Sequence, residues 1–343
     1  MFKKILIALL VIALIAGILG YQKYKDVFNP NVPEVLANNF LYVPSNSNFE
    51  DLVKLLTDQH FIDNEASFRW VAEQMSFVNS KVRSGRFEIK PKWSNRTLIN
   101  LLRNGKQSTV KVILTNERLP EDIAGKVSRV IEADSTSIDN LLRNDSFLAT
   151  YGYNRETAMS VFIPNTYDFF WNQNAKAFFE KMLKENEKFW NKKNRKEKAK
   201  KLGLSPQEVY TLASIVGRET NQVDEKPMIA GIYLNRIKIG MPLQADPTVV
   251  FAVRQFDLRR VLFKHLEYDS PYNTYMYRGL PPGPISMAEI SSIDAVLDFD
   301  DHEYIYFCAK GDGSGYHSFA KTLSGHNANA AQYRKNLKAR GKR

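Results

Sequence analysis

The chain is poor in the residues that build disulfide frameworks and metal centres. Its 343 residues include one cysteine, Cys308, and five histidines. A single thiol cannot form an internal disulfide, so the cysteine content leaves the redox compartment open. Cys308 lies in a strand-like apolar run, which is typical of a small buried hydrophobe. His317 and His326 match no standard ligand spacing with Asp312, so we predict surface histidines and no metal site.

Signatures of nucleic-acid and nucleotide binding are also missing. The 48 Lys and Arg residues outnumber the 37 Asp and Glu residues, which gives a net charge of +11. No helix-turn-helix, zinc-finger or RNP motif accompanies this charge, and Gly311–Gly315 lacks the Lys-Ser/Thr spacing of a phosphate loop. The excess charge lies mostly at residues 181–201, where we expect a solvated helical face; a membrane-surface patch and a groove for an acidic polymer are the alternatives. We predict no nucleic-acid partner and no cofactor.

One long apolar run stands at the N-terminus, from Ile5 to Gly20, after the basic residues Lys3 and Lys4. Its length is near the lower limit for a bilayer span and exceeds many signal-peptide cores. A cleaved signal peptide and an uncleaved signal anchor are the two alternatives. Ala16–Ile18 is a poor cleavage site, which favours an anchor at residues 5–22, and the basic residues before it predict a cytoplasmic N-terminus.

The next part of the chain predicts a small α+β module at residues 40–115. Extended runs at 41–44 and 87–91 each end at a proline and precede a capped apolar helical stripe, in a loose internal repeat. A third strand is expected at Thr109–Thr115. Pro120 then begins another helix.

The second half of the chain alternates helical and loop-forming segments. We expect a strand at Val161–Tyr167, a basic helical stretch at 170–202 and an amphipathic helix at Lys226–Ile239. Between Met241 and Ile285 the composition changes to Pro, Gly, Asp and Tyr. Such loops on a rigid scaffold are where binding sites are usually built.

Glu219 is the residue with the clearest chemical meaning. Ser205–Glu208 supplies an N-cap serine, a proline at the first helical position and a capping-box glutamate. Apolar residues recur at spacings of three and four from Val209, and Glu219 falls on that stripe. Burial disfavours a charged carboxylate, so this group can keep a proton near neutral pH and act as a general acid. The alternative is a structural carboxylate paired with Arg218 or Lys226.

Five motifs occur in a fixed order along the second half of the chain. They lie at residues 212–220, 243–249, 270–275, 279–285 and 309–313. Their order and spacing resemble the YceG-like family of endolytic murein transglycosylases, and the resemblance extends from the N-terminal anchor to Asn327. It implies cleavage of peptidoglycan between N-acetylmuramic acid and N-acetylglucosamine, with a 1,6-anhydro end left behind. It also implies that Glu219, before Thr220, is catalytic; many family members carry a second acid where this chain has Gly217.

A lone acid suits that chemistry. A glycoside hydrolase normally uses two carboxylates, whereas Glu219 could protonate the glycosidic oxygen and then accept the proton of the attacking C6 hydroxyl. Asp246 either assists electrostatically or caps the helix that Pro247 begins, and the sequence favours the cap. Hydrogen-bonding groups and flat rings for sugars are expected from the loops. The substrate-binding residues predicted are Gln244, Asp246, Thr248, Asn273, Thr274, Tyr275, Tyr167 and Ser318.

The sequence therefore predicts an α+β protein with an N-terminal transmembrane helix. Its parts are a cytoplasmic tail at 1–4, a signal anchor at 5–22, a LysM-like α+β module at 40–115 and a YceG-like catalytic domain at 116–343. We expect an endolytic lytic transglycosylase at the inner (plasma) membrane, with its catalytic domain on the extracytoplasmic, or periplasmic, side. Its partners would be glycan strands and the membrane, with peptidoglycan synthases as candidates. The alternatives are a membrane-anchored peptidoglycan-binding scaffold without catalysis, and a glycan hydrolase.

Overall fold

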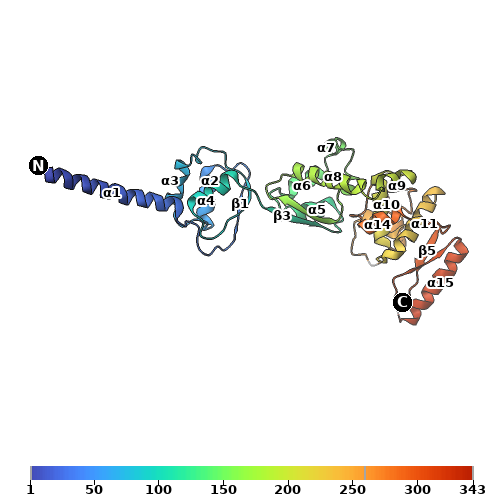
Figure 1. Cartoon of the computed structure of the whole chain (residues 1–343). Helices are drawn as coiled ribbons and strands as arrows, with labels where there is room; N and C mark the ends of the chain where they lie inside the picture. Colours follow the sequence, from blue (N-terminus) through green and yellow to red (C-terminus); the bar gives the residue numbers. More distant parts are fainter. Residues whose placement is uncertain (1, 259, 342–343) are drawn as a thin grey trace. The chain divides into compact units, whose positions relative to one another are not determined.

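The structure is a computed structural model that describes residues 2–258 and 260–341. The chain forms two compact units (Figure 1). The first comprises residues up to Lys111 with 130–133 and 168–174; the second comprises 112–129, 134–167 and the chain from Ala175 onward. The described residues contain many helices and three two-stranded sheets. The mixed helix and sheet class predicted from the sequence is confirmed.

The N-terminal helix α1 (Phe2–Phe28) has no buried residue, and it is the one helix of the described chain that is long and apolar enough to cross a membrane. The segment predicted to span, 5–22, lies within it. The helix then continues into the first unit, where Val27 packs against the core. Asn95 Nδ2 donates a hydrogen bond to the backbone oxygen of Asp26 over 2.8 Å. The end of α1 is therefore fixed to the unit that follows it.

The first unit is built of short, well-capped elements. In chain order they are β1 (Phe40–Val43), α2 (Phe49–Asp58), α3 (Glu65–Gln74), β2 (Gly85–Glu88) and α4 (Asn95–Asn104). The strands pair antiparallel, with Phe40 opposite Glu88. Side chains of Asn48, Asn64 and Ser94 accept backbone N–H bonds at the starts of the helices, which satisfies otherwise orphaned donors. The strands expected at 41–44 and 109–115 and the capped helices after the two prolines are confirmed, whereas the strand expected at 87–91 lies earlier, at Gly85–Glu88.

The second unit is mainly helical. Its helices are α5 (Pro120–Val127), α6 (Ser135–Leu142), α7 (Asp145–Ala149), α8 (Ala175–Asn191), α9 (Arg195–Lys201), α10 (Pro206–Glu219), α11 (Lys226–Lys238), α12 (Asp246–Val253), α13 (Phe263–Leu266), α14 (Ile290–Leu297) and α15 (Leu323–Ala339). β3 (Thr109–Leu114) and β4 (Asn165–Phe170) form a sheet, and the division between the units passes through both strands. β5 (Tyr306–Ala309) and β6 (His317–Ala320) form an antiparallel pair.

The strand expected at Val161–Tyr167 is partly wrong. A 3-10 helix covers Ala158–Val161, and β4 begins only at Asn165. Pro164 stands between them, and a proline cannot donate the hydrogen bond that a strand would need there. The predicted helices at Pro120 and at Lys226 are confirmed.

Helix α10 lies at the centre of the second unit. Its predicted capping box is confirmed, because Ser205 Oγ accepts from the N–H of Glu208 at 3.2 Å and Glu208 Oε2 accepts from the N–H of Ser205 at 2.7 Å. Every residue from Val209 to Val216 is buried, against α11, α12 and α14. At Gly217 a Cβ atom would lie 2.8 Å from Ser292 Oγ, so a glycine lets α14 approach closely.

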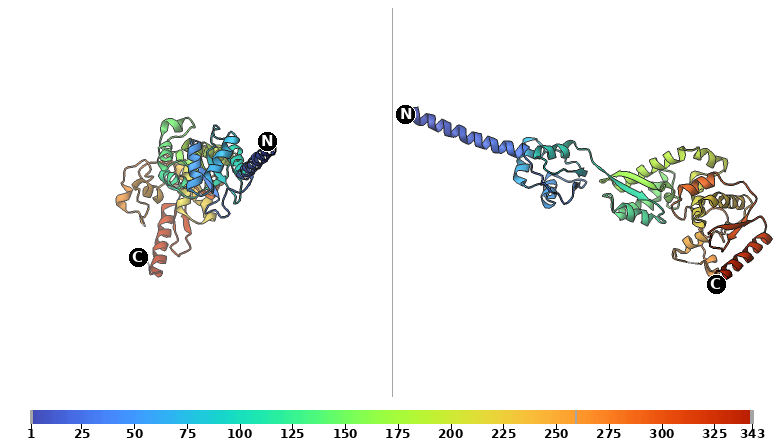
Figure 2. Two further views of the ribbon diagram at one scale, coloured as in Figure 1. Left: turned by 90° about the vertical axis from the view of Figure 1, so that its left-hand side faces the viewer. Right: turned by 60° about the horizontal axis from the view of Figure 1, so that its bottom comes forward.

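The C-terminal part of the second unit is a hairpin covered on one side by a helix. The views of Figures 1 and 2 agree that α15 lies along β5 and β6. No residue of α15 is buried, and Ala320 is the one buried residue of the two strands. This sub-structure is therefore packed much more lightly than α10.

Candidate active site

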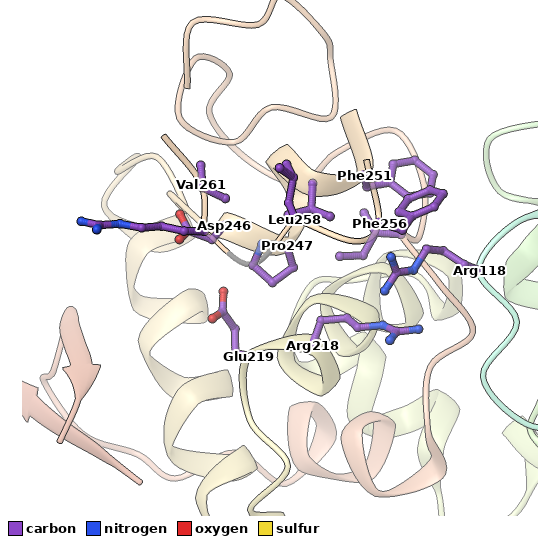
Figure 3. A pocket seen from close by; sticks show the side chains of 12 residues that line it. Arg118, Arg218, Glu219, Asp246, Pro247, Phe251, Phe256, Leu258 and Val261 are labelled. Atoms are coloured by element: carbon purple, nitrogen blue, oxygen red, sulfur yellow. The ribbon is translucent and has the colours of Figure 1, made fainter. Parts of the chain in front are cut away.

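Glu219 is the last residue of α10 and is half-buried. The hydroxyl of the buried residue Tyr233, on α11, donates to Glu219 Oε1 over 2.6 Å. Lys226 pairs with Glu289 over 2.6 Å, and Arg218 points away from Glu219 (Figure 3). The structural alternative, in which Glu219 pairs with Arg218 or Lys226, is therefore wrong.

The surroundings of Glu219 favour its protonated form. Burial raises the pKa of Glu219 from its ordinary 4.5 to about 7; the Tyr233 hydroxyl opposes this rise, the Asp246 charge adds to it and the Arg236 charge opposes it. Desolvation is the largest of these effects. A carboxyl group with a pKa near neutrality can both give and take a proton at physiological pH.

Glu219 lies between two pockets, and Asp246 lines both with it. The arginine pocket, with a volume of about 310 Å³, is also lined by Arg118, Arg218, Pro247, Val250, Phe251, Phe256, Leu258, Arg260, Val261 and Ile285. The aromatic pocket, of about 390 Å³, is also lined by Arg236, Gln244, Tyr275, Tyr306, Phe307, Cys308, Ala309, His317, Leu323 and His326. In Figure 3 the Glu219 carboxylate points toward Asp246 and Pro247. The two acids thus stand where the pockets meet.

Asp246 does not cap α12, so the interpretation favoured from the sequence is wrong. The N-cap is Ala245, in an extended conformation, and Asp246 is already the first residue of the helix. Its carboxylate is one position too late to accept the capping bond. Instead Asp246 Oδ1 accepts a hydrogen bond of 2.6 Å from the Tyr275 hydroxyl, which holds the exposed carboxylate at the rim of both pockets.

Three predicted substrate-binding residues are buried and hold the loop before Tyr275. Thr248 and Thr274 are joined by a hydrogen bond of 2.8 Å between their hydroxyls. Asn273 Nδ2 donates to the backbone oxygens of residues 266 and 268. All three are at most 1% exposed. They position Tyr275 and Asp246 rather than facing the solvent.

The remaining predicted residues are spread more widely. Gln244 is exposed in the aromatic pocket, in a left-handed conformation with φ 49°. Ser318, on β6, is half-buried and pairs with Cys308 on β5. Cys308, predicted to be a small buried hydrophobe, is only half-buried and lines the aromatic pocket; burial still raises the pKa of its thiol. Tyr167 is buried away from both pocket linings, with its hydroxyl donating to the Ile163 oxygen at 2.6 Å.

The sequence did not indicate the histidine–glutamate pair formed by His317, which lines the aromatic pocket, and Glu225 behind it. The buried residue Glu225 accepts from the His317 backbone N–H and faces His317 Nδ1, each at 2.7 Å, and it also accepts from Thr220 at 3.2 Å. The prediction that His317 is a surface residue is therefore wrong, because this carboxylate draws it inward. His326 stacks on Tyr306 with ring centres 5.4 Å apart. No local pattern announces these partners, since 92 residues separate Glu225 from His317.

The described residues contain no group of three or more His, Cys, Asp or Glu side chains arranged to hold a metal ion. The site offers proton transfer by Glu219, whose pKa lies near neutrality, beside the carboxylate of Asp246. Such a pair, placed between two pockets, suits the cleavage of a bond inside a longer molecule.

Comparison with known proteins identifies the class to which this fold and site belong. The model of the YceG-like family matches residues 41–332, and the chain belongs to that family. The crystal structure of a yceG-like protein from Listeria monocytogenes is similar, with a TM-score of 0.56 and 26% sequence identity, covering 84% of this chain and 97% of that one.

Named relatives are endolytic murein transglycosylases. The protein of Bacillus subtilis (strain 168) is 44% identical over 138 residues, which are 40% of this chain and 38% of the relative. That of Streptococcus pneumoniae serotype 2 (strain D39) is 22% identical over 366 residues, covering 96% of this chain and 65% of the relative. The chain thus spans less than two thirds of the length of each of these relatives.

Proposed function

We propose that the protein is an endolytic peptidoglycan lytic transglycosylase. It would cleave the bond between N-acetylmuramic acid and N-acetylglucosamine within glycan strands and leave 1,6-anhydro-N-acetylmuramic acid ends. The observation that carries the proposal is that Glu219, a carboxyl group with a pKa of about 7, lies where the two pockets meet. Membership of the YceG-like family and the names of the relatives support it.

In the first half of the reaction Glu219 acts as a general acid. Its proton passes to the glycosidic oxygen, and the bond from that oxygen to the anomeric carbon breaks. Positive charge develops on the sugar ring, as in other glycosidic cleavages. Asp246, whose Oδ1 accepts a hydrogen bond from the Tyr275 hydroxyl, lines the same pockets as Glu219 and stabilises that charge.

In the second half Glu219 acts as a general base. The C6 hydroxyl of the same sugar attacks the anomeric carbon, and its proton passes to the Glu219 carboxylate. The nucleophile is already part of the bound sugar, so no second molecule has to be positioned. Glu219 ends the cycle protonated, and no water is consumed. The hydrogen bond from Tyr233 stabilises the carboxylate between the two steps.

One observation favours hydrolysis as a second candidate. Glu219 and Asp246 line the same pockets, and two carboxylates are what a hydrolase requires. A hydrolase would use Asp246 to activate a water or to form a covalent intermediate. The two reactions differ in their products, because hydrolysis adds the elements of water and transglycosylation does not.

The test is mass spectrometry of digested strands. The full chain in detergent is incubated with purified glycan strands in water enriched in oxygen-18. Internal cleavage with anhydro ends and no label supports the proposal. Labelled reducing ends identify a hydrolase, and binding without new ends identifies a scaffold. Glu219→Gln, which keeps the shape and removes the proton, is the matched control.

The proposed location rests on α1. It serves as a single-pass anchor with the N-terminus in the cytoplasm and both units on the extracytoplasmic, or periplasmic, side of the inner (plasma) membrane. Because the end of α1 is fixed to the first unit, that unit is held at the membrane surface, where nascent strands and their synthases are found. Protease digestion of spheroplasts, before and after lysis of the inner membrane, tests this orientation: digestion only after lysis contradicts it.

The first unit has a role in the same proposal. Its order of elements, strand–helix–helix–strand with antiparallel strands, supports a LysM-like module at residues 40–115 that binds glycan, next to a catalytic domain at 116–343. Within that domain we retain Gln244, Asp246 and Tyr275 as substrate-binding residues, since all three line the aromatic pocket. Thr248, Asn273 and Thr274 support them, and contacts of Tyr167 and Ser318 with substrate stay predictions.

A further inference from the structure

Two arginines share one end of the arginine pocket. Arg118 comes from the segment before α5, and its guanidinium carbon lies 4.4 Å from the centre of the Phe256 ring. Arg218 comes from α10; its Nε donates to Ser286 Oγ at 3.1 Å and a terminal nitrogen donates to the Asn116 oxygen at 3.3 Å. In Figure 3 both guanidinium groups lie on the same side of the pocket, away from the Glu219 carboxylate.

Neither guanidinium forms a salt bridge with a carboxylate among the residues that the structure describes. The acids nearby are engaged elsewhere. Glu117 pairs with Lys126 and Glu289 pairs with Lys226. Asp122 accepts from the backbone N–H of Arg118, not from its side chain. Part of the hydrogen-bonding capacity of both side chains therefore faces the pocket.

The pair is electrostatically unfavourable as it stands. Burial lowers the pKa of both guanidinium groups, and the charge of Asp122 opposes this at Arg118. At Arg218 the charge of Arg118 lowers the pKa further, while the charge of Glu289 opposes it. The contrast within the same unit is Arg195, which is buried but bonded to Asp294 at 2.8 Å. Two half-buried like charges, with no carboxylate bonded to either side chain among the described residues, are an arrangement that an anion would stabilise.

We propose, on the basis of the proposed function, that Arg118 and Arg218 bind a carboxylate of the substrate strand beside the bond to be cleaved. The sugar backbone of peptidoglycan is uncharged apart from substituents on the lactyl group of N-acetylmuramic acid. That group carries a stem peptide with its own carboxylates, or a free carboxylate once the stem is removed. Both sources present the same chemistry, and a planar guanidinium fork binds carboxylates in a bidentate manner.

The consequence is a fixed register of the strand. Arg218 and Glu219 are consecutive in sequence but point in different directions, Arg218 toward Arg118 and Glu219 toward Asp246 (Figure 3). A carboxylate held at the arginines would therefore set which sugar lies over Glu219. Strands without a carboxylate would bind through the aromatic pocket alone, with less control of register.

Binding to three strand preparations tests this. The first bears stem peptides, the second has been treated with an amidase to expose the lactyl carboxylate, and the third is the second after that carboxylate is converted to a neutral amide. Affinities are measured with the full chain carrying Glu219→Gln, so that no strand is cut. Arg118→Gln and Arg218→Gln are compared with Arg334→Gln, an exposed arginine on α15 that changes the net charge equally.

We expect each pocket variant to weaken binding of a carboxylate-bearing strand by about tenfold or more, the usual effect of losing a charge-assisted hydrogen bond. Binding of the neutral strand and of every strand to the Arg334→Gln variant should not change. A loss of affinity for the first preparation assigns the bound carboxylate to the stem peptide, and a loss of affinity for the second assigns it to the lactyl group.

Equal losses on all three preparations, or none, overturn the inference. Thermal unfolding of each variant shows whether it is folded, and Arg218→Lys, which keeps the charge, should restore part of the affinity. The inference and the proposed function fail separately. If the protein with Glu219 intact forms no anhydro-ended glycan products, the proposed function is contradicted, whatever the affinities. If cleavage is normal and the affinities of the arginine variants are unchanged, only the arginine site is contradicted.

Discussion

The two pockets that meet at Glu219 differ in chemistry. The arginine pocket has cationic groups beside phenylalanines, whereas the aromatic pocket has tyrosines, histidines and neutral hydrogen-bonding groups. Its arginine, Arg236, is bound to the backbone oxygens of Ile305 and Leu243. The first suits a charged substituent and the second suits uncharged sugar rings. Because the two ends of a glycan strand also differ, a cleft with unlike sides can accept the strand in one direction. The shared acid then meets the same bond each time.

The largest expected effect comes from removing what the two pockets share. Glu219→Gln should lower the rate of strand cleavage by about 10²–10⁴-fold, the usual contribution of a positioned general acid. Binding in both pockets should persist, because glutamine keeps the shape of the side chain that lines them. Release of anhydro-ended fragments measures the rate, and Glu303→Gln, an exposed acid of the same unit, is the control. Cleavage by the Glu219→Gln variant at the normal rate would exclude this residue as the catalyst.

Asp246 is the second residue common to both pockets, and its loss should have the next largest effect. Asp246→Asn removes the negative charge near the developing positive charge, so we expect kcat to fall by about 10²-fold. The same charge raises the pKa of Glu219, so its removal should lower that pKa. The alkaline limit of activity would then move to lower pH. An unchanged kcat would show that Asp246 acts only through the hydrogen bond with Tyr275.

The pH profile itself separates the acid from its neighbours. Glu219 must start protonated, so kcat/KM should fall as pH rises through about 7. Tyr233→Phe removes a hydrogen bond that lowers the pKa of Glu219, so this limit should move to higher pH, with a several-fold loss of kcat. The opposite shifts of the Tyr233 and Asp246 variants are the signature to look for. A limit that stays in place in both variants would mean that another group controls it.

The free energy of unfolding should also depend on the ionisation of Glu219. The folded-state pKa of Glu219 is raised, so its favourable contribution is complete below the unfolded pKa of 4.5 and is lost as pH rises through about 7. Relative to the natural chain, Glu219→Gln should gain up to about 3 kcal/mol of unfolding free energy across this window. Urea unfolding at several pH values measures it. A constant difference between the two chains would contradict the raised pKa.

The smallest effect on activity is expected away from both pockets, at Gly217. A Cβ there meets Ser292 on α14, so Gly217→Glu should cost about 1–3 kcal/mol of stability through overpacking. Cleavage should change little, because the new acid begins on the face toward α14 and not toward the pockets. Gly217→Ala with Ser292→Gly, which gives the new methyl room, is the control. A large gain in rate for Gly217→Glu would instead assign that position a catalytic role.

The local parts of this site could be predicted from the sequence. The capping box and the apolar stripe of α10 depend on residues within one helix, and they led directly to Glu219. The segments before Asp246 and Tyr275 were recognised as loops that carry function. Such features depend on spacing along the chain, which the sequence displays.

The features of the site that the sequence did not predict depend on residues that are distant along the chain. Asp246 was expected to cap α12, but the Tyr275 hydroxyl binds it. Glu225, which draws His317 into the aromatic pocket, is 92 residues away from it. Arg118 and Arg218 come together only because the segment before α5 folds against α10. The spacing of residues along the chain does not predict which distant side chains will be in contact.

The light packing of the hairpin and α15 has a consequence for how a polymer enters the cleft. This sub-structure supplies several residues of the aromatic pocket, yet α15 has no buried residue. Segments with few buried contacts open at the lowest free-energy cost. We therefore expect the hairpin and α15 to move away from the aromatic pocket at a low free-energy cost. A long glycan strand could then enter the cleft from the side at any point along its length, without being threaded from one end.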